Sequence, residues 1–113
     1  MFGNYFRTLD DKNRVIVPAK LRDPLGRICY ITLGPDKVLE IRDEKSFETF
    51  KDKLMSPNML NVNARKFARI LLGNTHEVEL DKSGRIALPE HFLLQAGIAK
   101  EVVFVGVGNK VEL

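Results

Sequence analysis

The sequence has little of what marks secreted, membrane-bound or metal-dependent proteins. Its 113 residues include one cysteine and no tryptophan, and no apolar run approaches the roughly 18 residues that a membrane-spanning helix needs. Cys29 has no partner for an internal disulfide, which favours a reducing interior, and its place within CYITL predicts a small core residue. The amino terminus also lacks the basic and apolar regions of a signal peptide. We therefore expect a cytoplasmic protein without a membrane partner.

Patterns typical of catalysis are missing as well. The chain has neither a phosphate-binding P-loop nor a GxGxxG motif, and VGVGNK, at 105–110, is better explained as a hairpin turn. His76 and His91 lie on opposite sides of a predicted turn, without the spacing of metal ligands. We predict that the protein is not an enzyme and has no metal, cofactor or small-molecule substrate.

Neither positive nor negative side chains are in large excess. The formal net charge is +3 and the pI is about 9.1, a balance that permits a polyanionic partner without requiring one. Residues 1–37 carry seven basic side chains against four acidic ones. This mild bias favours nucleic acid as a partner over a surface that is merely solvated.

What the chain does have is an internal repeat. LDDKNR, from Leu9 to Arg14, returns as LDKSGR, from Leu80 to Arg85, and in both places three mostly apolar residues and a proline follow. Further on, YITLGPDKVLEI at 30–41 corresponds to VVFVGVGNKVEL at 102–113. Two matches in the same order indicate a duplication. Each copy is predicted to contain a strand, a turn, a second strand, a short helix and then a hairpin.

The turn residues support this assignment. Asn13 and Gly84 occupy the same position, and asparagine and glycine best tolerate the positive φ that a tight hairpin turn requires. Pro18 and Pro89 suit the first position of the short helices that follow. Gly97 is a plausible end for the second of these helices.

Between the copies the composition becomes helical. DEKSFETFKDKL, at 43–54, spaces its apolar residues as an amphipathic helix does, 56–58 should break it, and 61–74 should form a second helix that ends at Gly73. The predicted apolar faces consist of Phe47, Phe50 and Leu54 in the first helix and Ala64, Phe67, Ala68 and Leu71 in the second. An αα-hairpin is therefore expected after the first copy. The second copy stops at VEL, where an equivalent helix would start, so a carboxy-terminal tail is expected to be missing.

These elements predict a mixed α+β, β-rich fold. One copy of about 40 residues is too small to bury enough apolar surface, so two copies are expected to share a pseudo-twofold, barrel-like core. We place the first repeat and its following helix at 1–55, a connecting helix at 56–74 and the second repeat at 75–113.

The repeated DxxxR motif has two explanations. In one, Asp10 or Asp81 accepts turn amide hydrogens and the arginine closes an exposed salt bridge, worth about 0–1 kcal/mol. In the other, Arg14 and Arg85 enter a DNA major groove, where a guanidinium matches guanine O6 and N7, and the aspartates orient the arginines or hold the turns. The DNA-binding candidates are then the turn residues Lys12, Asn13, Arg14, Lys82, Ser83 and Arg85, with the lysines attracting phosphates. The residues alone leave these explanations about equally supported.

Nearly the whole chain resembles one family. The two DxxxR turns, ARILLGNTHEVELDKSGRIALP at 64–89 and KEVVFVGVGNKVEL at 100–113 are similar to the MraZ family of bacterial transcription regulators. The resemblance implies two tandem AbrB-like, swapped-hairpin repeats and a ring-shaped homo-oligomer. It also implies binding to short direct repeats in double-stranded DNA upstream of a cell-wall and division operon, with Arg14 and Arg85 as contacting residues. Asn13 departs from the glycine usual in such turns, and the family's helical tail is absent after Leu113.

These observations lead to a hypothesis and a rival. The hypothesis is a nucleoid-associated repressor of its own gene cluster that reads successive DNA repeats through the turn arginines of several subunits. The rival is a nonenzymatic homo-oligomeric assembly protein whose basic charge is incidental. Single-stranded RNA binding has weaker support because only Tyr5, Phe6 and Tyr30 are candidate stacking residues. Arg65, Lys66 and Arg69 are interpreted as a solvated helix face rather than a second DNA surface.

Overall fold

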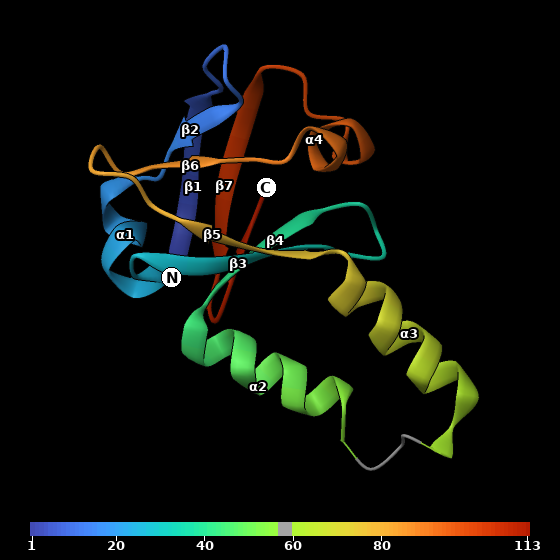
Figure 1. Ribbon diagram of the computed structural model, residues 1–113. Helices are drawn as coiled ribbons and strands as arrows, with labels where there is room; N and C mark the ends of the chain where they lie inside the picture. Colours follow the sequence, from blue (N-terminus) through green and yellow to red (C-terminus); the bar gives the residue numbers. More distant parts are fainter. Residues whose placement is uncertain (57–59) are drawn as a thin grey trace.

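The computed structural model describes residues 1–56 and 60–113 and has a mixed α/β architecture (Figure 1). The strands in the described ranges are β1 (Phe2–Thr8), β2 (Arg14–Ile16), β3 (Ile28–Leu33), β4 (Leu39–Asp43), β5 (Thr75–Glu79), β6 (Arg85–Ala87), β7 (Glu101–Val107) and β8 (Val111–Glu112). The helices there are α1 (Ala19–Leu25), α2 (Glu44–Leu54), α3 (Val62–Gly73) and α4 (Glu90–Ala96). None of these helices combines the length and apolarity needed to cross a membrane.

The strands form two antiparallel sheets. Six strands make the larger sheet, in the order β1-β7-β8-β4-β3-β5, and β2 pairs with β6 in a separate two-stranded ribbon. The predicted β-rich, mixed fold is confirmed at this level. The described strands do not close into a barrel, because β1 and β5 remain at opposite edges of the larger sheet.

Two of the predicted hairpins are present and two are not. β3 pairs with β4 and β7 pairs with β8, as the sequence predicted for 30–41 and 102–113. The predicted hairpins around the two DxxxR turns are wrong: β1 pairs with β7 rather than β2, and β5 pairs with β3 rather than β6. Each turn is tight, but the strands on its two sides continue into different sheets.

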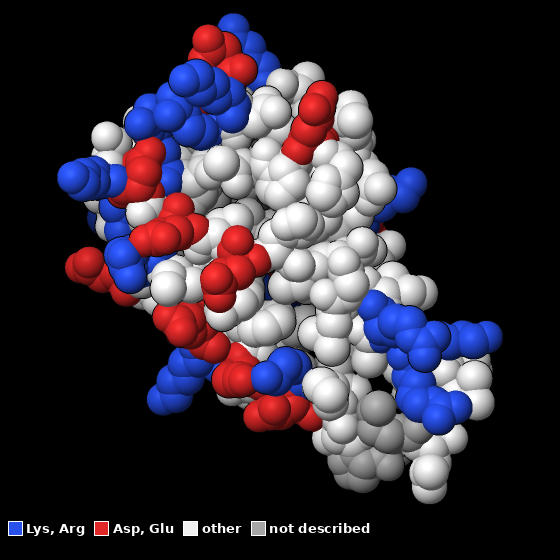
Figure 2. Space-filling model, in the orientation of Figure 1, with Lys and Arg blue, Asp and Glu red and all other residues white. Residues whose placement is uncertain are grey.

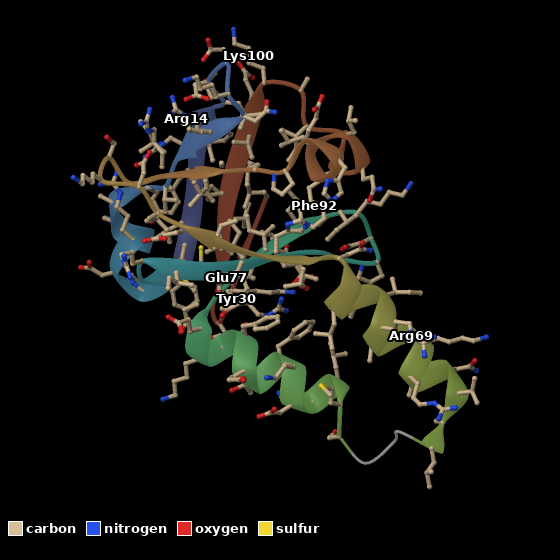
Figure 3. All side chains as sticks on the ribbon, in the orientation of Figure 1. Arg14, Tyr30, Arg69, Glu77, Phe92 and Lys100 are labelled. Atoms are coloured by element: carbon tan, nitrogen blue, oxygen red, sulfur yellow. The ribbon has the colours of Figure 1, made fainter. Side chains whose placement is uncertain are left out.

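The core lies between the ribbon, the larger sheet and the short helices α1 and α4. Val15 and Ile86 face inward from the ribbon, while their neighbours Arg14 and Ile16 face outward, because successive strand residues point to opposite faces. Phe92 of α4 lies against the sheet in Figure 3 and is fully buried. The other large side chains of this core include Leu21, Leu25, Ile31, Leu39, Ile41 and Phe104.

The predicted helices are confirmed, with small shifts at their ends. Pro18 and Pro89 are the capping residues immediately before α1 and α4, one position earlier than predicted, and their φ angles of −53° and −57° fit the start of a helix. Gly97 ends α4 with φ +70°, as predicted. Gly73 is the last residue of α3, and Asn74 caps it. The predicted break at 56–58 falls mainly outside the described residues.

Helices α2 and α3 extend away from the sheet at an angle to one another (Figure 1). Phe47 of α2 stacks on Tyr30 of β3, with ring centroids 4.3 Å apart. Arg42 places its guanidinium 3.7 Å from the ring centroid of Phe50. In α3, Ala68 and Leu71 are buried as predicted. Phe67, predicted on the same face, remains 47% exposed.

Cys29 has the environment of a structural residue. Its side chain is fully buried in β3, and this burial raises the pKa of the thiol to about 12. Because the thiolate is the reactive form, we expect no alkylation of the native protein at pH 8 and complete alkylation after denaturation, measured by mass shift. Rapid modification of the folded chain would contradict this packing.

Candidate nucleic-acid interface

The β2–β6 ribbon brings the two repeated arginines onto one face. Its register pairs Arg14 with Ala87 and Ile16 with Arg85 across the strands. All four side chains point away from the core because Val15 and Ile86, the central pair, point into it. The outer face of the ribbon therefore carries two guanidinium groups on adjacent strands.

The first turn is organised by Asp10. Its Oδ1 accepts hydrogen bonds from the backbone amides of Lys12, at 2.9 Å, and Arg14, at 2.8 Å. Its Oδ2 accepts from Nε of Arg14 at 2.8 Å. The Asp10 amide in turn donates to the Arg14 carbonyl at 2.8 Å. One carboxylate thus closes the turn and fixes the arginine that leaves it.

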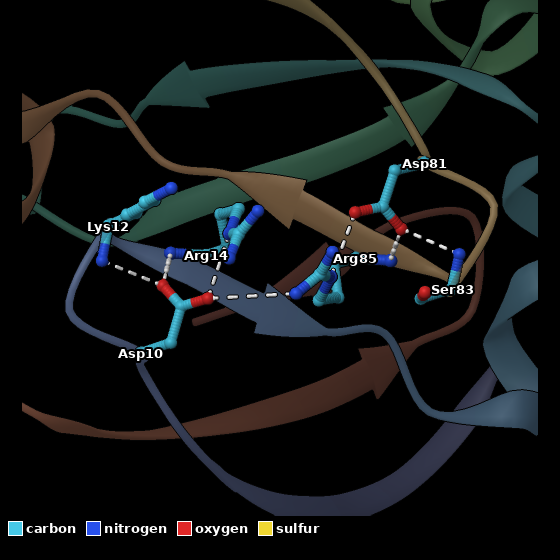
Figure 4. Close-up of polar contacts among 6 residues, drawn as sticks. All are labelled: Asp10, Lys12, Arg14, Asp81, Ser83 and Arg85. Carbon is cyan, nitrogen blue, oxygen red and sulfur yellow. Dashed lines mark hydrogen bonds and ion pairs between the residues drawn. The ribbon is translucent and has the colours of Figure 1, made fainter.

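The second turn repeats this arrangement. Oδ1 of Asp81 accepts from the amides of Ser83 and Arg85 at 2.8 and 2.9 Å, and Oδ2 accepts from Nε of Arg85 at 2.8 Å. Figure 4 shows the two Asp–Arg pairs approaching one another along the ribbon. Oδ2 of Asp10 also lies 3.9 Å from Nη1 of Arg85. The two motifs therefore form one charged cluster although 71 residues separate them.

This placement corrects one sequence-based expectation. The sequence suggested that the arginines sit at the edges of separate projecting turns, whereas the structure places them side by side on the ribbon. They are not sealed beneath neighbouring loops, because the side chains of Arg14 and Arg85 are each 31% exposed. The aspartate–arginine salt bridges of the simpler explanation are present as well.

The aspartates are held in their ionised form. Hydrogen bonding from the Arg14 backbone amide, with further contributions from its guanidinium and the Lys12 amide, lowers the pKa of Asp10 below its ordinary value. The amide of Arg85, followed by its side chain and the Ser83 amide, lowers the pKa of Asp81 in the same way. Both carboxylates are therefore charged at neutral pH. Their support for the turns should weaken only in acid, as the pH falls through these lowered values.

The remaining predicted residues lie in or beside the turns. Lys12, Lys82 and Ser83 are exposed, and Asn13 is half-buried. Asn13 and Gly84 have φ of +59° and +77°, which confirms that both positions need the left-handed region. The Asn13 carbonyl accepts a hydrogen bond from the Leu88 amide at 2.9 Å. Its backbone therefore helps to hold the first turn against the second repeat segment.

Basic side chains are also present far from the ribbon. Figure 2 shows blue groups at the upper left, over the turns, and again at the lower right, where Figure 1 places α3. Arg65, Lys66 and Arg69 of α3 are all exposed, and α3 contains no acidic residue. A solvated face and a second DNA surface would both show this exposure, so the interpretation as a solvated face stays a prediction.

Sequence reasoning missed one aromatic pair. The ring centroids of His76, on β5, and His91, on α4, lie 5.4 Å apart, and both rings contact Phe92. Their separation along the chain gave no sign of this proximity, because it depends on how α4 packs against the sheet. The described residues contain no group of three or more metal-ligating side chains around them.

Comparison with known proteins finds one family. A family model described as "MraZ protein, putative antitoxin-like" matches residues 1–70 and 71–113. A protein of Mycoplasma mobile is 50% identical over 113 residues, which cover all of this chain and 77% of that protein. A Mycoplasmopsis pulmonis protein is 48% identical with the same coverage, and one from Caldanaerobacter subterraneus is 38% identical over all of this chain and 79% of its own length.

Each of these relatives is named "Transcriptional regulator MraZ". The class of protein they define is a regulator rather than an enzyme, as the sequence predicted. The chain belongs to the MraZ family.

Proposed function

We propose that this chain is a sequence-specific DNA-binding transcription regulator whose β2–β6 ribbon reads bases in the major groove. The observation that carries the proposal is the pair of partly exposed arginines, Arg14 and Arg85, on adjacent strands of one two-stranded ribbon. A B-DNA major groove, about 12 Å wide, admits a two-stranded β-ribbon. The names of the relatives as transcriptional regulators give independent support.

The aspartates would orient the arginine side chains before they contact DNA. Each carboxylate binds Nε of its own arginine, so it leaves the Nη1 and Nη2 side of that guanidinium without a hydrogen bond to the described residues, although Oδ2 of Asp10 lies 3.9 Å from Nη1 of Arg85. That side can donate two parallel hydrogen bonds to O6 and N7 of guanine. Holding the side chain in advance also reduces the rotamer entropy that binding would otherwise cost. The salt bridge would then serve base reading, because it holds each arginine side chain in place before DNA binds.

The turns would supply contacts that do not depend on sequence. Lys12 and Lys82 are exposed residues of the two turns, one in each, and can approach phosphates of the DNA backbone. Ser83 and Asn13 offer short polar side chains near the same positions. We propose that these four residues position the ribbon while Arg14 and Arg85 specify the bases.

The strand pairing supports a tandem repeat with interleaved strands. Suppose that strands β1–β4 of the first repeat correspond in order to strands β5–β8 of the second. The pairing of β1 with β7 then corresponds to the pairing of β5 with β3, and both pairs are present. The pairing of β2 with β6 corresponds to itself, as a twofold relation between the repeats requires. We propose two AbrB-like, swapped-hairpin units related by a pseudo-twofold axis. The divisions at 1–55, 56–74 and 75–113 then separate the first unit, the connecting helix and the second unit.

We further propose that several copies act together as a nucleoid-associated ring that represses its own gene cluster from upstream direct repeats. A second contact made within one assembly has an effective concentration of order millimolar, so several matched repeats should bind far more tightly than one. Fluorescence polarisation on duplexes of equal length, with one repeat or several, measures this difference. Equal affinity for both would contradict multivalent reading.

One set of observations also fits the rival function as an assembly protein. Large apolar side chains are exposed around the two longer helices: Met55, Leu60, Val62, Phe67 and Ile70. Such surfaces commonly mark contacts between proteins. Assembly alone predicts that changing Arg14 has no effect on DNA binding, which separates it from the proposed function.

A further inference from the structure

We propose that Arg22 of α1 is a third DNA-contacting arginine, which binds a backbone phosphate beside the second turn and gives the ribbon a direction on DNA. This inference rests on the proposed function, since it concerns how the same ribbon meets the duplex. No sequence pattern singled out the side chain of Arg22.

The side chain of Arg22 is fixed by the backbone around the ribbon. Its Nε donates a 2.8 Å hydrogen bond to the carbonyl of Val17, and the Val17 amide donates to the carbonyl of Gly84 at 2.8 Å. The guanidinium packs directly on Gly84, since a Cβ built there would lie 2.5 Å from Cζ of Arg22. Gly84 immediately precedes Arg85. Arg22 is therefore held against the turn that presents Arg85.

This arrangement matches that of the two ribbon arginines. In Arg14, Arg22 and Arg85 alike, a protein oxygen accepts from Nε at 2.8 Å. Within the described residues, neither Nη atom of Arg22 makes a hydrogen bond or ion pair, and the side chain is half-buried. A guanidinium held in this way can bind a phosphate without first giving up much side-chain freedom.

The surroundings of Arg22 form an open hollow beside the second turn. The hollow has a volume of about 760 Å³, and its lining includes the basic residues Arg22, Arg27 and Lys82. Three acidic residues also line it: Asp23, Glu79 and Asp81. Glu79 is paired with Arg27 at 2.6 Å and Asp81 with Arg85 at 2.8 Å. Two of the three carboxylates are thus already matched by arginines, so the lining keeps two further cations, Arg22 and Lys82, against one further carboxylate, Asp23.

The residue that corresponds to Arg22 in the second repeat is not an arginine, although Lys100 lies beside the first turn, where its carbonyl accepts from the Leu9 amide at 2.8 Å. The spacing that relates Pro18 to Pro89 relates Arg22 to Leu93, a buried residue of α4. Asn13 occupies the position in the first turn that Gly84 occupies in the second. The two Asp–Arg pairs are closely similar, but Arg22 packs on Gly84 in the second turn, whereas the residue that corresponds to Arg22 in the other repeat is the apolar Leu93.

This asymmetry has a functional consequence. A ribbon with true twofold symmetry would fit a DNA site equally well in both orientations, and could not distinguish a direct repeat from an inverted one. A phosphate contact at one end favours a single orientation. Arg22 would thereby align successive subunits in the same direction along direct repeats.

The test compares Arg22→Leu, which introduces the residue found at the corresponding position 93, with Arg69→Leu on α3 as a matched control. On duplex from the upstream region, Arg22→Leu should weaken binding roughly tenfold, as expected when a charge-assisted hydrogen bond is removed. It should also reduce the salt slope by about 0.9 for each phosphate that the variant no longer neutralises. Arg69→Leu should change neither quantity.

Phosphate-ethylation interference gives a readout that a merely structural role would not change. With the wild-type protein, the phosphates whose ethylation blocks binding should extend further on one side of each repeat than on the other. Arg22→Leu should abolish the effect at these additional phosphates and leave the rest of the interference pattern unchanged. A wild-type salt slope and an unchanged interference pattern in Arg22→Leu would overturn the proposal. A general loss of binding with loss of folded structure by circular dichroism would assign Arg22 a purely structural role and also overturn it.

These outcomes are distinguishable from failure of the proposed function. If the wild-type protein binds upstream DNA and Arg14→Ala removes that binding while Arg22→Leu behaves as wild type, only the role of Arg22 fails. If neither the wild-type protein nor any variant prefers the upstream duplex to a shuffled sequence, the proposed function itself fails.

Discussion

Replacing Arg14 and Arg85 together by alanine is expected to remove sequence-selective binding to duplex DNA while leaving the protein folded. Each bidentate contact to guanine contributes about 1–3 kcal/mol of base discrimination, so removing both should lower the preference for the specific site by roughly 30-fold or more. Both side chains are partly exposed and lie outside the apolar core, so folding should not depend on them. Fluorescence polarisation with specific and shuffled duplexes measures the preference.

A double replacement of Lys66 and Arg69 provides the matched control. It removes the same charge from α3, far from the ribbon in Figure 1, and tests whether net charge alone explains any decrease in affinity. We expect this control to retain its preference for the specific duplex. If the two double variants lose the same fraction of selectivity, the ribbon is not the reading surface.

The largest effect on stability is expected from Phe92→Ala. Phe92 is fully buried in the shared core, with its ring 4.9 Å from that of His76 and 4.7 Å from that of His91. Truncating a buried phenylalanine to alanine lowers the free energy of unfolding by about 3–5 kcal/mol, because the apolar packing of the ring disappears and a cavity remains. Urea denaturation at one fixed protein concentration should show a lower midpoint with an unchanged slope.

Leu94→Ala is the control on the same helix. The Leu94 side chain is 75% exposed, so its truncation should change the free energy of unfolding by less than about 0.5 kcal/mol. A similar destabilisation in both variants would mean that α4 packs differently from the arrangement in which Phe92 points into the core.

Local features of this fold could be predicted from the sequence. The apolar spacing of 43–54 and 61–74 indicated two helices, and the Asn13 and Gly84 positions indicated positive φ. These predictions succeeded because they depend on interactions within a few residues. The turn contacts of Asp10 and Asp81 were foreseen for the same reason, since acceptor and donors lie within four residues of each other.

The pairing of distant segments could not be predicted in the same way. Nothing in the sequence of β1 distinguishes β2 from β7 as its partner, because a strand's apolar pattern fixes its buried face but not its neighbour. The hairpin prediction at the DxxxR turns failed there. The side-by-side position of Arg14 and Arg85, and the packing of Arg22 on Gly84, depend on this long-range pairing.

The structure bears on the two explanations that the sequence left open, because it contains the salt bridges of the first and leaves the arginines partly exposed, as the second requires. The salt bridges of Arg14 and Arg85 with their aspartates are present, and both arginines remain accessible on the ribbon. The pairs are partly exposed, so their contribution to stability should be small. Their more important effect is to fix the direction of each guanidinium.

The central claim is tested most directly by footprinting the DNA upstream of the protein's own gene with the wild-type protein and Arg14→Ala side by side. We expect a periodic pattern of protected repeats with the wild-type protein and its disappearance with Arg14→Ala, although the variant keeps its circular dichroism spectrum. An identical periodic footprint from both proteins would contradict base reading by the ribbon arginines.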